Sequence, residues 1–72
     1  MNDADRSVLA DIAKALELLR GAASDLDTEA DRFYELGDNW RGNIRHDAGY
    51  RLLQLAESVQ SATSHLPKAL EK

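Results

Sequence analysis

The sequence predicts an all-α protein that folds as an antiparallel helical hairpin. Apolar residues recur at the 3,4 spacing of a helix in both halves, a cluster of Gly, Asn and Asp separates the halves, and no stretch alternates as a strand would. The 72 residues allow a single domain, 1–72, which is too short to bury a large core of its own. We therefore expect the hairpin to self-associate into a four-helix or larger bundle.

The first helix is predicted over about residues 5–36. Asn2, Asp3 or Asp5 can cap its start, and early acidic residues suit the positive end of the helix dipole. An apolar stripe fills every inward position for four heptads, which indicates an amphipathic helix. The stripe comprises Leu9, Ile12, Leu16, Leu19, Ala23, Leu26, Ala30 and Phe33, and it is widened on one side by Val8, Ala15, Ala22 and Leu36.

Residues 37–43 are predicted to form the turn, because Gly37, Gly42 and their Asn and Asp neighbours favour left-handed backbone and helix capping. A second helix is predicted over about 44–66, capped by Asn43 and ending before Pro67, since the residue before proline disfavours helix. Residues 67–72 form a short tail or one extra turn. The predicted stripe of this helix is Ile44, Ala48, Leu52, Leu55, Val59, Ala62 and Leu66.

The large apolar residues of the two stripes are the predicted oligomer seam. Leu18, Tyr50 and Leu53 lie outside it, and two interpretations remain open: a second contact surface, or the isolated exposed apolar residues that are normal on soluble proteins. The seam residues are Leu9, Ile12, Leu16, Leu19, Leu26, Phe33, Leu52, Leu55 and Val59.

Charge and composition exclude several classes of function. The net charge is −4, but residues 1–38 carry ten acidic against four basic side chains, while residues 39–72 carry three against five. This asymmetry favours antiparallel pairing and argues against duplex DNA as a partner. With no Cys and two His, we expect no metal site and no cofactor. No apolar run reaches the length of a membrane span or a signal peptide, so the expected location is cytoplasmic, without membrane contact.

One end of the hairpin gathers the candidate binding residues. Cationic and aromatic side chains fall within eleven residues there, against a single acid, a composition that suits a phosphate-bearing small molecule or an acidic protein partner. For Trp40 a second interpretation stays open, in which it plugs the open end of the bundle. The candidates are Trp40, Arg41, Arg45, His46, Asp47 and Tyr50.

The spacing of Arg41 and His46 resembles the Arg-x4-His element of the HEPN-type ribonucleases. That resemblance implies His46 as acid and base and Arg41 as the group that stabilises phosphate charge. No Ser stands in a strand-to-helix elbow, as a Ser/His/Asp hydrolase would require. We expect a non-enzymatic protein and retain the ribonuclease as a remote alternative.

Two further resemblances involve the turn and the second helix. Trp40-Arg41-Gly42, preceded by about forty residues, resembles the turn of the WxG helical-hairpin family, which implies a small antiparallel dimer exported by type VII secretion. The stretch Trp40–Val59 resembles the second helix of phage anti-CBASS and anti-Thoeris sponges. These are non-enzymatic oligomers that sequester cyclic-nucleotide immune signals, and the resemblance implies that Arg45 and Asp47 orient one another or help to assemble the oligomer.

Together these patterns predict a small oligomer that works by binding. We expect a phage- or bacterium-encoded regulator or inhibitor that either sequesters an immune signalling nucleotide or blocks a host protein. A secreted WxG-type dimer is the alternative.

Overall fold

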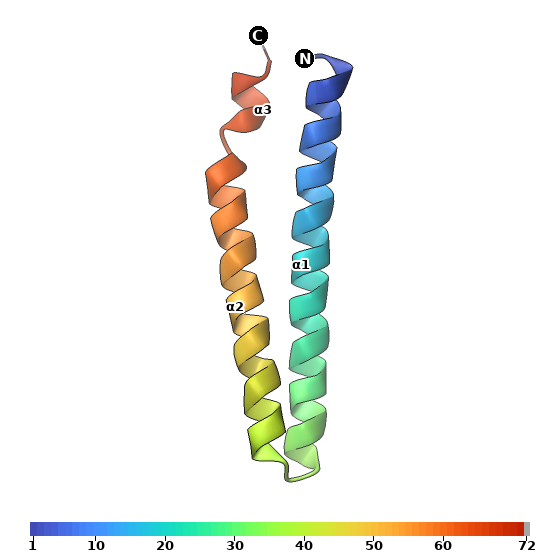
Figure 1. Ribbon diagram of the computed structural model, residues 1–72, viewed down its shortest axis with the longest axis vertical. Helices are drawn as coiled ribbons and strands as arrows, with labels where there is room; N and C mark the ends of the chain where they lie inside the picture. The colour runs from blue at the N-terminus through green and yellow to red at the C-terminus, as the bar shows by residue number, and fades with distance from the viewer. Residues whose placement is uncertain (72) are drawn as a thin grey trace.

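The structure, a computed structural model that describes residues 1–71, is a hairpin of two long helices (Figure 1). Helix α1 spans Asp3–Glu35, α2 spans Asn39–Thr63, and the short α3 spans Leu66–Ala69. Helices α1 and α2 run antiparallel side by side, so both chain ends lie opposite the turn. The molecule extends 56 × 17 × 10 Å. The prediction of an all-α antiparallel hairpin is confirmed.

Helix α1 agrees closely with its predicted stripe. It begins at Asp3 because the Asn2 side chain accepts a hydrogen bond from the Asp5 N–H at 2.8 Å. All eight stripe residues are buried or half-buried, whereas the neighbouring Val8, Ala15, Ala22 and Leu36 are exposed. The stripe is the surface that faces α2.

The turn is shorter than predicted. Gly37 adopts φ +80°, a left-handed conformation that glycine reaches without the strain of a Cβ. The Asp38 N–H donates to the Phe33 carbonyl at 2.9 Å and the Gly37 N–H to the Tyr34 carbonyl at 3.0 Å, which is a Schellman ending of α1. Asp38 then caps α2. Residues 39–43, predicted as turn, are therefore helical, and Asn43 is not the cap.

The buried stripe of α2 differs from the prediction. Its most buried residues are Gly42, Gly49 and Ala56, seven positions apart. Leu52, Val59 and Leu66 are half-buried as expected, and so is Ala48. The remaining predicted stripe residues, Ile44, Leu55 and Ala62, are exposed, Leu55 to 50%.

Close packing of the backbones explains this shift. A Cβ built on Gly49 would lie 3.1 Å from the Ala23 carbonyl oxygen, so a larger side chain would force the helices apart. Small residues face one another here because they permit that approach. The large aliphatic residues that define a hydrophobic pattern are displaced to the sides.

Near the carboxyl end, α2 ends at Thr63, and Pro67 lies in the first turn of α3. Proline is tolerated at this place because the first N–H groups of a helix have no intrahelical acceptor. Of the two predictions for residues 67–72, the extra turn is observed through Ala69. Lys72 lies outside the described residues.

The hairpin encloses very little apolar volume. Ala23, Ala30 and Ala56 are the buried hydrophobic residues, and among residues 1–71 no large side chain is fully buried. Two helices in contact along one line cannot surround a leucine. The large seam residues therefore remain partly open to solvent.

Candidate binding site at the turn end

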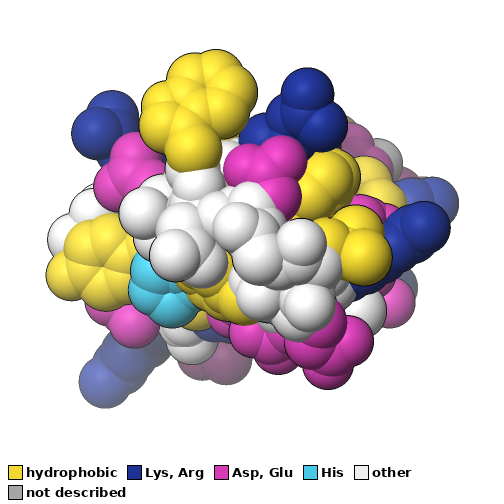
Figure 2. All heavy atoms as spheres, turned by 90° about the horizontal axis from the view of Figure 1, so that it is seen from below, with side chains coloured by type: hydrophobic (Ala, Val, Ile, Leu, Met, Phe, Trp, Pro, Cys, Tyr) yellow, Lys and Arg dark blue, Asp and Glu magenta, His cyan; other side chains and the backbone are white. Residues whose placement is uncertain are grey.

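The six candidate residues lie on the first three turns of α2. Viewed from the turn end, hydrophobic side chains stand exposed between charged ones (Figure 2). Trp40 lies in the first turn of α2 and is 72% exposed. The interpretation of Trp40 as a plug for the open end of a bundle concerns the oligomer and stays a prediction. In the single hairpin the Trp40 indole is presented to solvent.

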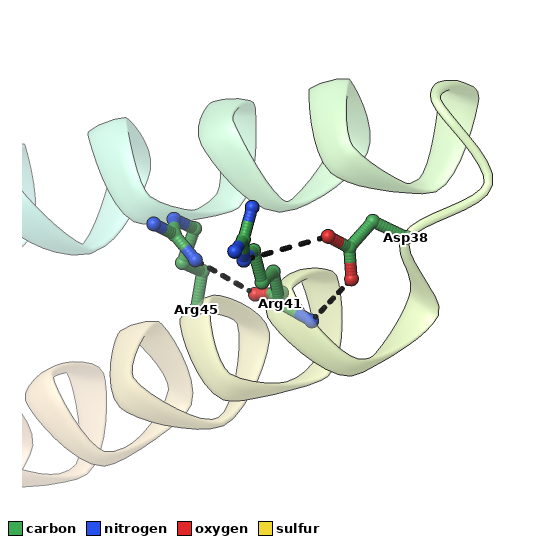
Figure 3. A network of polar contacts seen from close by, with 3 residues as sticks. All are labelled: Asp38, Arg41 and Arg45. Atoms are coloured by element: carbon green, nitrogen blue, oxygen red, sulfur yellow. Dashed lines mark hydrogen bonds and ion pairs between the residues drawn. The ribbon is translucent and has the colours of Figure 1, made fainter.

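Arg41 is held by the residue that caps its own helix (Figure 3). The Arg41 backbone N–H donates to Asp38 Oδ1 at 3.1 Å, and Arg41 Nε lies 3.5 Å from Asp38 Oδ2. In addition, Arg45 Nη1 donates to the Arg41 carbonyl oxygen at 3.1 Å. The contacts of Arg41 therefore stabilise the start of α2.

Arg45 belongs to the contact between the two helices. Its guanidinium lies 4.1 Å from the centroid of the Phe33 ring, and the residue is half-buried. This is a cation–π contact with the last residue of the α1 stripe. In the single hairpin Arg45 and Asp47 have different partners, and Asp47 Oδ2 lies 2.9 Å from Arg51 Nε. The other implication of the sponge resemblance, that Arg45 and Asp47 help to assemble the oligomer, stays a prediction.

One side of the hairpin is closed by polar contacts between α1 and α2. Arg20 Nη2 donates to Gln60 Oε1 at 2.5 Å, and Tyr34 Oη donates to Asn43 Oδ1 at 2.6 Å. His46 Nδ1 lies 3.6 Å from Asp27 Oδ1, an ion pair when the imidazole is protonated. The three α1 residues are seven positions apart and so lie in one row. We call this side, defined by Arg20, Asp27, Tyr34, Asn43, His46 and Gln60, the polar flank.

The structure does not gather the six candidates into one cluster. Arg41 and His46, five residues apart, point about 140° from one another around α2 and have different partners. Tyr50, 57% exposed, and Leu53, 40% exposed, lie next to the polar flank, whereas Leu18, 64% exposed, lies on the other side of α1. The three cationic candidates make contacts within the hairpin, and the two aromatic ones remain exposed.

Sequence reasoning missed the small residues of α2 and the polar contacts of Tyr34 and Asp27. The usable signal was the recurrence of Gly42, Gly49 and Ala56 at seven-residue intervals, which matches that of Ala23 and Ala30 in α1. Because Gly42 was interpreted as a turn residue, the seven-residue recurrence of small residues in α2 was not recognised. A Cβ on Gly42 would fall 2.5 Å from the Tyr34 ring, so the glycine makes room for that ring.

Replacing Asp38 with alanine should lower the free energy of unfolding by about 1 kcal/mol, because it removes the side-chain cap of α2. Asp38→Asn keeps an oxygen that can accept from the Arg41 N–H and removes only the exposed ion pair, so its effect should be smaller. Thermal denaturation followed by circular dichroism measures both. Equal losses in the two variants would assign the stabilisation to the ion pair instead.

Within residues 1–71, none of the helices has the length and apolarity needed to cross a membrane. The same residues contain no group of three or more His, Asp and Glu side chains placed to hold a metal ion, and no pocket. Compared with known proteins, the chain matches no family model, no curated protein and no solved structure. The resemblances to WxG hairpins, phage sponges and HEPN ribonucleases stay predictions.

Proposed function

We propose that this protein is non-enzymatic and works by binding: it self-associates into a helical bundle and, in that form, engages a protein partner as a regulator or inhibitor. The observation that carries the proposal is the exposure of its large apolar side chains, since within residues 1–71 the buried hydrophobic residues are three alanines. A hairpin with so small a core gains stability by covering these side chains with another protein surface.

The contacts at the turn end favour a protein over a phosphate-bearing small molecule. Arg41 and Arg45 already have partners within the hairpin, so neither is poised as a free anion ligand. Trp40 is exposed, and tryptophan is the residue type most enriched among the anchors of protein interfaces. The phage or bacterial origin is proposed from the resemblance of residues 40–59 to phage sponges, which themselves bind nucleotides, and it stays a prediction.

Native mass spectrometry of protein purified from its natural background tests this proposal. We expect an oligomer without a small-molecule adduct, which captures a defined partner in a pull-down. A nucleotide-sized adduct would instead support signal sequestration. A monomer at micromolar concentration would contradict self-association.

Trp40→Ala then tests the turn end. Because Trp40 is 72% exposed in the hairpin, the variant should keep a melting temperature close to that of the wild type. It should weaken binding of the captured partner by at least about tenfold, the usual effect of removing an interface tryptophan. Leu53→Ala, which removes a 40%-exposed side chain outside the turn end and beside the polar flank, is the control. Equal binding by wild type and Trp40→Ala would exclude Trp40 from the interface.

A further inference from the structure

One side of the hairpin carries apolar side chains that are mostly exposed. In α1, the row that directly precedes the stripe holds Val8, Ala15 and Ala22, then Glu29, and it ends at the C-cap residue Leu36; all five are exposed. Leu18 lies one turn from Ala15 and Ala22 and extends the row. The polar flank lies on the opposite side of the stripe. We name the aliphatic flank by its residues: Val8, Ala15, Leu18 and Ala22 of α1, Leu36 at its C-cap, and Ile44, the half-buried Ala48, Leu55 and Ala62 of α2. Glu29 and Arg41 lie in the same rows, toward the turn.

The two helices contribute to one continuous surface. The residue numbers of α1–α2 side-chain contacts sum to between 73 and 80 and centre on about 77, from His46 with Asp27 and Tyr34 with Asn43 to Arg20 with Gln60. By the same rule Ala22 lies level with Leu55. In an antiparallel pair, rows that precede the stripe on both helices share one side. The aliphatic flank therefore spans α1 and α2 through the middle of the molecule.

The exposed area matches what a dimer needs to bury. The chain exposes 5453 Å², whereas a compact protein of its mass, 8.0 kDa, is expected to expose about 4,450 Å². The excess is about 1,000 Å², close to the roughly 800 Å² that each partner buries in a stable interface. A second copy of the same thin hairpin fits this area.

We propose that a second copy of this chain docks on the aliphatic flank, flank against flank, with both turns at the same end of the four-helix bundle. This inference rests on the self-association proposed above and adds its surface and its orientation. The two-fold axis runs parallel to the helices, so α1 of each copy faces α2 of the other. Two Trp40 side chains then stand at one end of the dimer.

Charge sets this orientation. The row beside the flank on α1 carries Asp11, Asp25 and, nearer the turn, Arg32. The matching row carries Arg51 of α2, which also pairs with Asp47 of its own helix, and His65 just beyond the end of α2. With both turns at one end, Asp25 lies level with Arg51 of the second copy, and Asp11 with His65 of the second copy. These rim contacts join opposite charges whenever the imidazole is protonated, and they steer assembly more than they strengthen it.

The reverse orientation brings like charges together. With the turns at opposite ends, α1 lies against α1, and residues 1–38 of each copy carry ten acidic against four basic side chains. Centred on Leu18, that arrangement places Asp11 of one copy level with Asp25 of the other. Like-charge contacts along the rim disfavour it.

A pair of leucine variants tests the surface. Leu55→Lys introduces a charge at the centre of the aliphatic flank, whereas Leu53→Lys makes the same change beside the polar flank. Sedimentation equilibrium should show the dimer dissociation constant raised by about a hundredfold for Leu55→Lys, because the charge is buried unpaired, and changed less than about threefold for Leu53→Lys. Both leucines are substantially exposed in the hairpin, so circular dichroism should show both variants folded.

A distance between labels tests the orientation. The chain contains no Cys, so Glu35→Cys gives a single attachment point for a spin label at the turn end, on an exposed residue. With both turns together, the two labels should lie roughly 20–35 Å apart, since neighbouring helix axes are about 8–10 Å apart and the label linkers add the rest. With the turns opposed, their separation should approach the 56 Å length of the hairpin.

The outcomes separate this inference from the proposed function. A wild-type monomer would overturn self-association and the inference with it. A wild-type dimer that Leu55→Lys leaves intact would overturn the docking surface alone, and a dimer with the long label distance would overturn the orientation alone. The short distance together with the loss of the Leu55→Lys dimer supports both.

Discussion

Gly49→Leu should destabilise the hairpin by about 2 kcal/mol or more. The new Cβ would lie 3.1 Å from both the Ala23 carbonyl oxygen and Asp27 Oδ1, before the rest of the side chain is placed. Overpacking of this kind typically costs about 1–3 kcal/mol. Because the obstacle includes backbone, the helices must separate, and the contacts of neighbouring layers weaken too. Chemical denaturation followed by circular dichroism measures the loss.

The same substitution at Gly21 provides the control. A Cβ on Gly21 meets nothing within 4 Å, so Gly21→Leu adds a side chain to an open surface of α1. Removing glycine from a helix interior favours the helix by up to about 1 kcal/mol, so this variant should be more stable than wild type. Opposite signs at the two glycines would establish close packing at Gly49. A stable Gly49→Leu variant would show that the helices do not approach as closely as described.

Gly42 and Gly49 also explain why the sequence predicted the buried face of α1 but not that of α2. Large apolar residues fill most inward positions of α1, where hydrophobic periodicity identifies them directly. In α2, the inward positions 42, 49 and 56 hold Gly, Gly and Ala, and position 45 holds an arginine that stacks on Phe33. A hydrophobic pattern does not identify glycine or arginine as inward-facing, so the predicted stripe included Leu55 and other exposed residues instead.

The turn was misplaced for a related reason. Asn39, Gly42 and Asn43 are residues that favour turns, yet Asp38 caps α2 while its own N–H closes the end of α1. Because Asp38 contributes to the end of α1 and to the start of α2, the connection is short. A prediction from composition does not include these hydrogen bonds. At the candidate site, proximity in sequence predicted a cluster. The helix instead distributes its members around α2, because neighbouring positions on a helix differ by about 100°.

Truncation to alanine should affect Leu19, which lies in the contact between α1 and α2, differently from Leu55, which lies outside that contact. Leu19 is half-buried between α1 and α2, so Leu19→Ala should lower the free energy of unfolding by about 2–5 kcal/mol at every protein concentration. That is a large fraction of the stability of a domain this small. Denaturation midpoints at several protein concentrations measure it. An unchanged midpoint would remove Leu19 from the seam.

Leu55 lies 50% exposed in the single hairpin, so truncating it should cost the isolated chain far less than truncating Leu19. If the aliphatic flank is covered by a second copy, Leu55→Ala weakens the dimer, and its destabilisation grows as the concentration rises into the range where the wild type dimerises. The predicted seam included both leucines. A concentration-dependent loss for Leu55→Ala beside a constant loss for Leu19→Ala would assign Leu19 to the contact within one chain and Leu55 to the contact between two. If the two variants shift together at all concentrations, Leu55 belongs to the packing of the hairpin itself, and the aliphatic flank is not where the second copy binds.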